Sequence, residues 1–273
     1  KNRLDTVEAF VENTSILKSI RNDLQNTADI QRILGKANKD KASPRDLYFL
    51  GDTLEKIPVW QEILKSSNNS SLKSLSRTFL DTSKLFRKIK HVISKDTPTL
   101  LIKGNVINNG VDTELDELRG VVLNGKKWLE SFQGSLRKDL EIPKLKIGYN
   151  KIFGFFIEVT KSHQEKIPSS FIRKQTLTNS ERYITEELKE YEQKVLNAEQ
   201  NIYNIELKIF NDICVEIMEH IIELQKNASA ISYLDFYSSL AFLAVKNNYV
   251  KPTLSNKLTL DIFDGRHPVV EQL

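Results

Sequence analysis

The sequence has little of several features that mark other protein classes. Its 273 residues contain one cysteine, Cys214, so no internal disulfide bond can form, which fits a reducing compartment. Only 10 glycines and 7 prolines interrupt the chain, and 40% of its residues are hydrophobic, which favours a well-packed, mostly helical protein. The apolar runs are far shorter than the ~20 residues that a membrane-spanning helix needs, so the sequence predicts no membrane partner.

Catalytic and metal-binding patterns are also scarce. No Gly-x-x-x-x-Gly-Lys-Ser/Thr loop is available to hold nucleotide phosphates. Acidic pairs such as Asp116-Glu117 have the placement of helix-start or solvent-facing charges, not of a paired acid and base. We therefore expect neither catalytic residues nor a bound cofactor or metal ion in this chain. The histidines, which fall on separate predicted elements without other ligands at metal spacing, are His91, His163, His220 and His267.

Two segments with heptad spacing predict a pair of long helices. In each, apolar residues recur at alternating intervals of three and four, the period of a helix packed against one partner. The two runs match in length, so we expect them to pair antiparallel as a stalk with residues 137–184 at its tip. The first run is Leu115, Leu118, Val122, Gly125, Leu129, Phe132 and Leu136, and the second is Leu188, Tyr191, Val195, Ala198, Ile202, Ile205 and Ile209.

Capping signals place the ends of these helices. Thr113 is predicted to cap the first helix, and Thr185, which precedes two glutamates, is predicted to cap the second. The second helix would run for about 40 residues, on the order of 60 Å, to a turn at residues 227–229. Gly125 lies in the predicted seam, where the missing side chain would let the partner helix approach closely.

The tip has the period of β-strands. Apolar residues alternate with others on both sides of Asn150-Lys151, which predicts a hairpin with a two-residue turn at that pair. A third short strand is expected around residues 171–177, and the alternation predicts a small core under the hairpin. The alternating residues are Leu145, Ile147 and Tyr149 before the turn and Phe153, Phe155, Ile157 and Val159 after it.

Positive charge is concentrated in the same segment. Residues 137–184 contain ten lysine and arginine residues and five acidic residues, a net charge of +5, whereas the rest of the chain holds 30 and 31, a net charge of −1. Within it, Arg173-Lys174-Gln175-Thr176 places two cations and two hydrogen-bonding side chains in succession, a combination suited to phosphate oxygens. The alternative is a basic loop that only water contacts.

The remaining segments predict shorter elements. Ser43-Pro44 is typical of a helix start, and Pro58 is expected to end that helix. Gly35 is predicted to end the preceding helix. After Pro252, apolar residues alternate with polar ones over residues 257–262, which predicts a half-buried strand.

Three ordered motifs resemble the clamp and lever of the MutS family of DNA mismatch-recognition ATPases. They are LKIGYNKIFGFFIE at 145–158, IRKQTLTNSERYI at 172–184 and ELKEYE at 187–192. Residues 42–47, 110–118 and 265–271 are also similar to segments of that family, so the resemblance covers nearly the whole chain.

This resemblance implies a mainly α fold, in which a helical core bundle carries a long antiparallel, coiled-coil-like lever with a small β-rich clamp at its tip. It implies no enzyme activity for this chain, because ATP and Mg²⁺ would bind in an ATPase domain of which only the start is present. The implied domains are a first part of the core (1–112), an outgoing lever helix (113–136), the clamp (137–184), a returning lever helix (185–226), a second part of the core (227–252) and the truncated start of the ATPase domain (253–273).

The resemblance also implies partners and a contact surface. Double-stranded DNA would be gripped by its backbone, a second copy of the protein and mismatch-repair proteins would assemble with it, and the location would be cytoplasmic and DNA-associated. The expected backbone contacts are Lys146, Tyr149, Asn150, Lys151, Arg173, Lys174, Gln175, Thr176 and Asn179, with Arg182 a weaker candidate.

Two alternatives from other classes stay open. The stalk could be a structural coiled-coil arm whose tip docks on a protein. It could also be a helical arm that binds RNA, as in some tRNA synthetases, since no base-reading motif separates DNA from RNA. The basic tip with consecutive polar side chains favours a nucleic acid over a protein.

Overall fold

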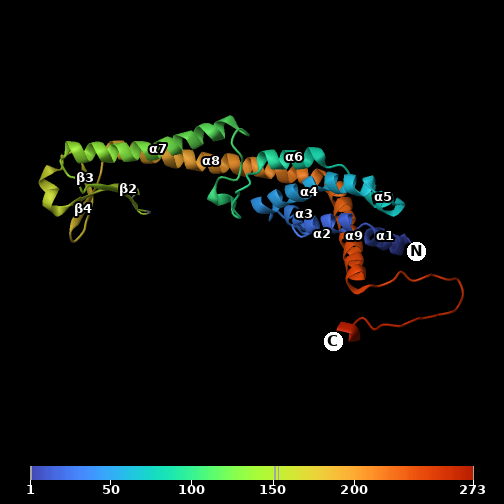
Figure 1. The fold of residues 1–273 in the computed structure, drawn as a ribbon. Coiled ribbons are helices and arrows are strands. Elements are labelled where there is room, and N and C mark those ends of the chain that lie inside the picture. Colours follow the sequence, from blue (N-terminus) through green and yellow to red (C-terminus); the bar gives the residue numbers. More distant parts are fainter. Residues whose placement is uncertain (1, 151, 153, 273) are drawn as a thin grey trace. The chain divides into compact units, whose positions relative to one another are not determined.

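The computed structural model describes residues 2–150, 152 and 154–272 and divides the chain into two compact units. The first unit comprises residues 1–28, 55–82 and 222–273, and the second comprises residues 29–54 and 83–221. Both are mainly helical (Figure 1). The helices are α1 (Asn2–Glu12), α2 (Thr14–Leu24), α3 (Ile30–Ala37), α4 (Pro44–Ser66), α5 (Ser70–Ser76), α6 (Ser83–Val92), α7 (Thr113–Asp139), α8 (Glu186–Glu219) and α9 (Ile221–Asn247). The strands are β1 (Lys146–Asn150), β2 (Gly154–Thr160), β3 (Ile172–Thr176) and β4 (Ser180–Ile184).

The first unit contains α1, α2, α5, the second half of α4 and nearly all of α9. Trp60 is fully buried in its core, and its indole nitrogen donates to Asp23 at 3.1 Å. Asn227 of α9 is also buried, accepting from the backbone N–H of Leu80 at 2.7 Å and donating to its carbonyl at 3.0 Å. The predicted turn at residues 227–229 is therefore wrong, because Asn227 pairs with another segment and α9 continues through it.

Two predicted helix ends are also wrong. Pro58 lies inside α4, which continues to Ser66. A proline in a helix costs about 3 kcal/mol, but buried Ile57 and Trp60 on either side of it keep the helix in the core. Gly35 lies inside α3, which continues to buried Ala37.

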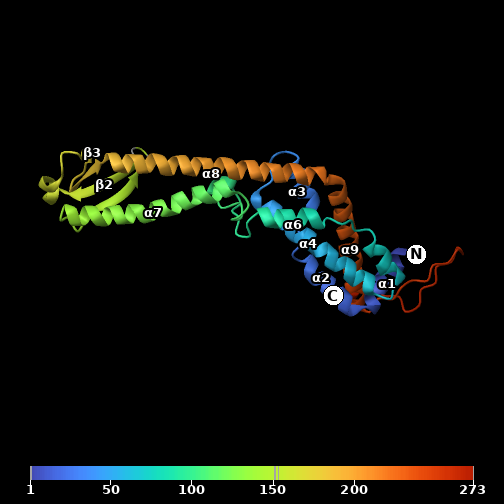
Figure 2. The same ribbon diagram turned by 90° about the horizontal axis from the view of Figure 1, so that it is seen from above.

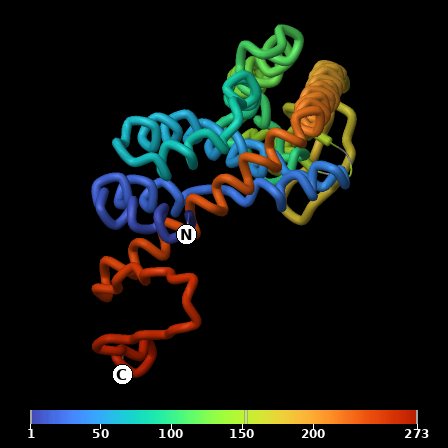
Figure 3. The backbone as a smooth tube through the Cα atoms, turned by 90° about the vertical axis from the view of Figure 1, so that its right-hand side faces the viewer, coloured from blue at the N-terminus to red at the C-terminus, as the bar shows by residue number. Residues whose placement is uncertain are grey.

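The segment after α9 forms no strand in the described residues. Leu258, Leu260 and Ile262, the apolar residues of the predicted strand, are all exposed, and Figure 3 shows this stretch as an irregular trace. A strand needs a neighbouring strand to pair its backbone groups, and no described strand pairs with this segment.

α9 corrects the expectation that no segment is apolar enough to cross a membrane. By length and composition alone it satisfies that test, with a mean hydropathy of 1.3. Core helices pass the same test, and α9 carries the fully buried polar residues Asn227 and Ser238. Composition alone therefore does not assign α9 to a membrane.

The second unit is built on α7 and α8, which run antiparallel side by side (Figures 1 and 2) and are called the helical pair below. Thr185 caps α8 as predicted, accepting from the N–H of Leu188. Asp112, not Thr113, caps α7, since its carboxylate accepts from the N–H of Leu115. α8 ends at Glu219, earlier than predicted.

The predicted seam of the helical pair is confirmed at its close approach. A Cβ placed on Gly125 would lie 3.1 Å from the ring of Tyr191 and 3.3 Å from Val195, so glycine permits the contact.

Further along α8, burial raises the pKa of the Cys214 thiol to about 11, as expected for a packed cysteine and not a nucleophile.

The described strands form one antiparallel sheet in the order β1-β2-β4-β3. The predicted hairpin (β1 and β2) and third strand (β3) are confirmed, whereas β4 was not predicted. Ile157 and Tyr183 face the helical pair and pack with Leu188 of α8. Gln133 of α7 accepts a hydrogen bond from the N–H of Ile147 at 2.7 Å, so α7 satisfies an outer backbone group of β1.

Candidate nucleic-acid interface

The face of the sheet opposite the helical pair carries a charged row across all strands. Residues opposite one another in antiparallel strands point to the same face. The register pairs Lys146 with Glu158, Glu158 with Arg182, and Arg182 with Gln175. Lys146, on the edge strand β1, is the exposed residue at one end of this row. This row defines an open face bearing polar groups.

Arg182 holds this row together. Its Nε donates to Glu158 at 2.9 Å and its Nη1 donates to Gln175 at 2.9 Å. Its guanidinium also lies 4.2 Å from the ring centroid of Phe156, and a Cβ on Gly148 would lie 2.7 Å from Cζ of that ring. Arg182 and Gln175 are therefore engaged inside the sheet and are less available to an external ligand.

Cations gather where β1 begins and β2 ends. Arg137, Lys144 and Lys146 line a hollow of about 460 Å³ together with Thr160 and Ser180. Arg137 is fixed there because its Nε donates to the carbonyl of Leu145 at 2.7 Å. We call Arg137, Lys144, Lys146 and Lys161 the basic end, since Lys161 directly follows Thr160.

The carboxylates near the basic end already have other partners. Glu181, which interacts electrostatically with Lys161, accepts hydrogen bonds from Tyr183 and Arg173. Glu158 also lines the hollow, but its carboxylate is already paired with Arg182. The backbone N–H of Lys161 donates to the carbonyl of Asn179 at 3.2 Å, which places the β3–β4 turn nearby. Lysine, arginine, hydroxyl and amide groups are those that contact phosphate oxygens in protein–DNA interfaces. The basic end therefore brings together groups of the kinds that contact phosphate.

The outer edge of the sheet carries a second pair of cations. Arg173 and Lys174 are exposed on β3, where the register shifts between residues 173 and 175 in a bulge. Arg173 forms an ion pair with buried Glu181 at 3.2 Å. The hydrogen bond from Tyr183 lowers the pKa of Glu181 against the effect of burial, and burial with the same hydrogen bond raises the pKa of Tyr183 to about 12. Arg173 thus balances an internal carboxylate, whereas Lys174 is an exposed cation.

The hairpin turn differs from the predicted one. The last pair of the ladder joins Asn150 to Gly154, so three residues lie between them in place of the predicted two-residue turn, and Gly154 has a positive φ of 77°. Asn150 accepts from the N–H of Ile152 at 2.8 Å. Tyr149 is 54% exposed. Lys151, like Phe153 of the predicted small core, lies outside the described residues.

This turn lies beside negative charge. The N–H of Phe155 donates to the Glu192 carboxylate of α8 at 3.4 Å. That carboxylate would be only 2.0 Å from a Cβ on Gly154. Electrostatic repulsion makes this end of the sheet less suited to phosphate than the basic end.

The structure therefore separates the predicted contacts into groups. β1 and β3 are opposite edges of the sheet, three strand spacings or roughly 14 Å apart. The basic end contains Lys146, with Asn179 close by; the turn contains Tyr149 and Asn150; the β3 edge contains Arg173, Lys174, Gln175 and Thr176. Sequence reasoning did not single out Arg137, Lys144, Thr160, Lys161 and Ser180 as candidate contacts. All of these except Arg137, which lies in the last turn of α7, are at or within two residues of a strand end.

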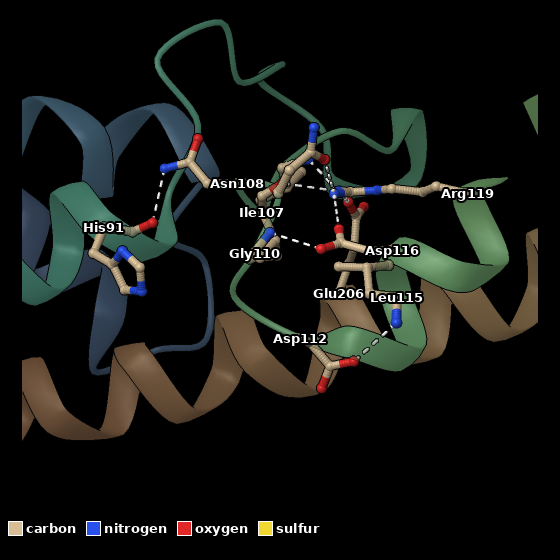
Figure 4. Close-up of polar contacts among 11 residues, drawn as sticks. His91, Ile107, Asn108, Gly110, Asp112, Leu115, Asp116, Arg119 and Glu206 are labelled. Carbon is tan, nitrogen blue, oxygen red and sulfur yellow. Dashed lines mark hydrogen bonds and ion pairs between the residues drawn. The ribbon is translucent and has the colours of Figure 1, made fainter.

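At the end of the helical pair away from the sheet, Arg119, Glu206 and Asp116 make a cluster of polar contacts, called the polar joint below (Figure 4). Arg119 of α7 donates to Glu206 of α8 at 2.6 Å and to the carbonyl of Ile107 at 2.8 Å. Glu206, fully buried, also accepts from the N–H of Val106 at 3.2 Å, and Asp116 accepts from the N–H of Gly110 at 2.7 Å. The two helices and the loop that precedes α7 are thereby linked by directed contacts.

The segment that bears the sheet matches a known domain family. Residues 110–201, which include α7, all four described strands and the first part of α8, match the model of MutS family domain IV. The sheet carried by the helical pair thus belongs to a domain class found in MutS proteins.

The whole chain is similar to curated proteins named DNA mismatch repair protein MutS. It is 37% identical over 272 residues to that of Salinibacter ruber, 38% over 272 residues to that of Flavobacterium psychrophilum, and 41% over 273 residues to that of Clostridium beijerinckii. These matches cover 100%, 100% and 99% of this chain. The chain is a MutS-family sequence, and it spans 30%, 31% and 29% of the length of these relatives.

Proposed function

We propose that this chain is the part of a DNA mismatch repair protein that grips duplex DNA by its backbone, with the basic end as the main contact. The observation that carries this proposal is the convergence of Arg137, Lys144 and Lys146 on one hollow with the hydroxyls of Thr160 and Ser180. Contacts from such groups to phosphate fix a protein on the duplex without reading its sequence. The expected binding is non-specific and depends on salt.

The remaining expected contacts take different parts in this proposal. Asn179 and Thr176 would extend the contact from the basic end, and Arg173 and Lys174 would meet a neighbouring stretch of backbone along the β3 edge. Tyr149 and Asn150 would contribute less, because Glu192 lies beside the turn.

The helical pair would couple DNA binding to the rest of the protein. α7 and α8 join the sheet to the polar joint of Arg119 and Glu206, so a force on the sheet would reach buried contacts at the other end. We propose that this lever acts on an ATPase domain, which would hold ATP and Mg²⁺, in an assembly with a second copy and mismatch-repair proteins. The chain itself would neither bind ATP tightly nor hydrolyse it, and turnover that follows the protein peak through repurification would contradict this.

The test of the DNA contact is the salt dependence of duplex binding. Each neutralised phosphate contributes about −0.9 to the slope of log K against log salt concentration. Replacing Lys144 and Lys146 by glutamine should flatten the slope by about one to two units. Replacing Arg173 and Lys174 by glutamine tests the β3 edge in the same way, with helix content checked by circular dichroism.

A matched control uses two exposed cations away from the sheet. Lys39→Gln with Lys41→Gln removes the same charge from the second unit and should leave the slope unchanged. The proposal fails if this control weakens binding as much as the basic-end pair does. Competition between duplex DNA and structured RNA for the unmodified chain decides between the DNA-binding proposal and an RNA-binding arm.

A further inference from the structure

α8 covers the apolar stripe of α7 only in part. Leu115 is the buried residue of α7, and further along the helix Leu129 and Phe132 are half-buried. Trp128 is 38% exposed although its ring stacks between Phe132, at 4.8 Å, and Tyr191 of α8, at 4.6 Å. A large aromatic surface is thus ordered by its neighbours but still open to solvent.

These aromatic rings lie in a groove of about 900 Å³ between α7 and α8. Its lining on α7 recurs at intervals of three and four residues from Val121 to Asp139, and its lining on α8 recurs similarly from Glu187 to Val195. The α7 side is roughly 27 Å long at 1.5 Å per residue. The α8 side, from Glu187 to Val195, is roughly 12 Å long by the same rise per residue. Two helical stripes that run side by side form the floor on which a third helix packs in a bundle.

The charge of the groove distinguishes it from the basic end. Asp139, Glu187 and Glu190 line it, against one cation, Lys194. Among the described residues, these three carboxylates form no ion pair or side-chain hydrogen bond, and all are exposed. The groove therefore combines an aromatic floor with an acidic rim.

We propose that the groove between α7 and α8 binds an amphipathic helix with lysine or arginine flanks, supplied by a partner protein. The apolar stripe of that helix would cover Trp128, since a partly exposed aromatic residue in a pocket is typical of an interface anchor. Its cations would face Asp139, Glu187 and Glu190, which favours basic over acidic helices. This surface is separate from the basic end, so the inference does not depend on DNA binding.

The probe is an 18-residue helical peptide with leucines at intervals of three and four and lysines on both flanks, labelled for fluorescence anisotropy. A second peptide has the same leucines, with glutamate in place of every lysine. The lysine peptide should bind the full chain at least tenfold more tightly than the glutamate peptide. Equal affinity for the two peptides would overturn the proposal.

Paired variants locate the binding. Trp128→Ala should weaken binding of the lysine peptide at least tenfold, whereas Leu123→Ala, which removes an exposed residue outside the groove lining, should change it less than twofold. Glu190→Lys should weaken it about threefold or more, whereas Glu130→Lys, an exposed site outside the lining, should not. Glu190→Lys leaves the core intact, so it remains decisive if Trp128→Ala fails to fold.

Two further results would also reject the partner helix. Loss of peptide binding in both Glu130→Lys and Glu190→Lys would mean unspecific attraction to acidic charge. Concentration-dependent dimerisation in sedimentation, abolished by Glu190→Lys, would assign the groove to a second copy of the chain. In contrast, unchanged peptide binding in the Lys144→Gln, Lys146→Gln variant would support a site distinct from the basic end.

Discussion

Arg119 of α7 and Glu206 of α8 form an ion pair that is almost closed to solvent. The Nη2 and Oε1 atoms are 2.6 Å apart, and the side chains are 16% and 0% exposed. The pair lies at the end of the helical pair away from the sheet, where Val106 also bonds to Glu206. It is therefore the tightest polar link between α7 and α8 that the structure describes.

Removing one member of this pair should destabilise the second unit strongly. Glu206→Ala removes the buried carboxylate at 2.6 Å from Arg119 and leaves only that of Asp116, at 3.6 Å. Breaking a buried ion pair in this way typically costs about 3–5 kcal/mol in the free energy of unfolding. Urea denaturation followed by circular dichroism measures this loss. The exposed pair of Lys189 and Glu186 is the control, since Lys189→Ala should cost no more than about 1 kcal/mol. If Glu206→Ala lowers the free energy of unfolding by less than Lys189→Ala does, the polar joint does not stabilise the packing of α7 against α8.

Asp46 should make the stability of α4 depend on pH. It accepts from the N–H of Ser43, whose hydroxyl accepts from the N–H of Asp46. Burial would raise the pKa of Asp46, but hydrogen bonds from Lys36 and Ser43 outweigh burial and hold this pKa below its usual value. A carboxyl group with a lowered folded pKa stabilises the protein above its unfolded pKa of about 4 and loses this effect as pH falls through the folded value.

Asp46→Asn should therefore cost about 1 kcal/mol at pH 7, as loss of a helix-start contact typically does. The difference from the unmodified chain should shrink as pH falls below about 4. Thermal denaturation between pH 7 and pH 3 measures both effects. A difference that stays constant over this range would show that the charge of Asp46 contributes nothing.

Gly148→Ala should overpack the open face of the sheet. The added methyl group would lie 2.7 Å from Cζ of the Phe156 ring, which also contacts the guanidinium of Arg182. Overpacking of this kind costs about 1–3 kcal/mol. Gly134→Ala is the control, because no atom lies within 4 Å of its added methyl group and alanine favours the α7 helix by up to about 1 kcal/mol. Opposite shifts in melting temperature are expected for the two variants.

Matched and mismatched duplexes should bind this chain equally well. The basic end offers cations and hydroxyl groups for phosphates, and phosphate contacts carry no direct sequence information. Anisotropy titrations at one salt concentration should give affinities that agree within error. A reproducible tenfold preference for the mismatch, about 1.4 kcal/mol, would mean that this chain itself reads the lesion.

Local patterns were sufficient to predict much of the second unit. The heptad spacing predicted the helical pair, and Thr185 caps α8 as its sequence context indicated. The helix ends that were predicted wrongly depend on packing between segments distant in the sequence. α4 continues past Pro58 because residues on both sides are buried, and α9 passes through residues 227–229 because Asn227 bonds to Leu80, which is distant in the sequence.

The candidate site was predictable as a segment but not as a surface. Net charge identified residues 137–184, yet strand order alone separates Lys146 from Arg173 at opposite edges. The hollow is also lined by Arg137, which lies at the end of α7 and donates a hydrogen bond to the carbonyl of Leu145, directly before β1. Neither the strand order nor that contact follows from the spacing of charges in the sequence.

The two edges of the sheet differ in a way that bears on aggregation. An open strand edge can recruit a strand from another molecule, and proteins guard such edges with charge or bulges. At the β1 edge, the side chain of Gln133 of α7 accepts a hydrogen bond from the backbone N–H of Ile147. At the β3 edge, the strand has a bulge, and Arg173 and Lys174 are exposed. We therefore expect Arg173 and Lys174 also to disfavour pairing of β3 with a second sheet, so that their replacement by neutral residues would promote association of molecules through this edge.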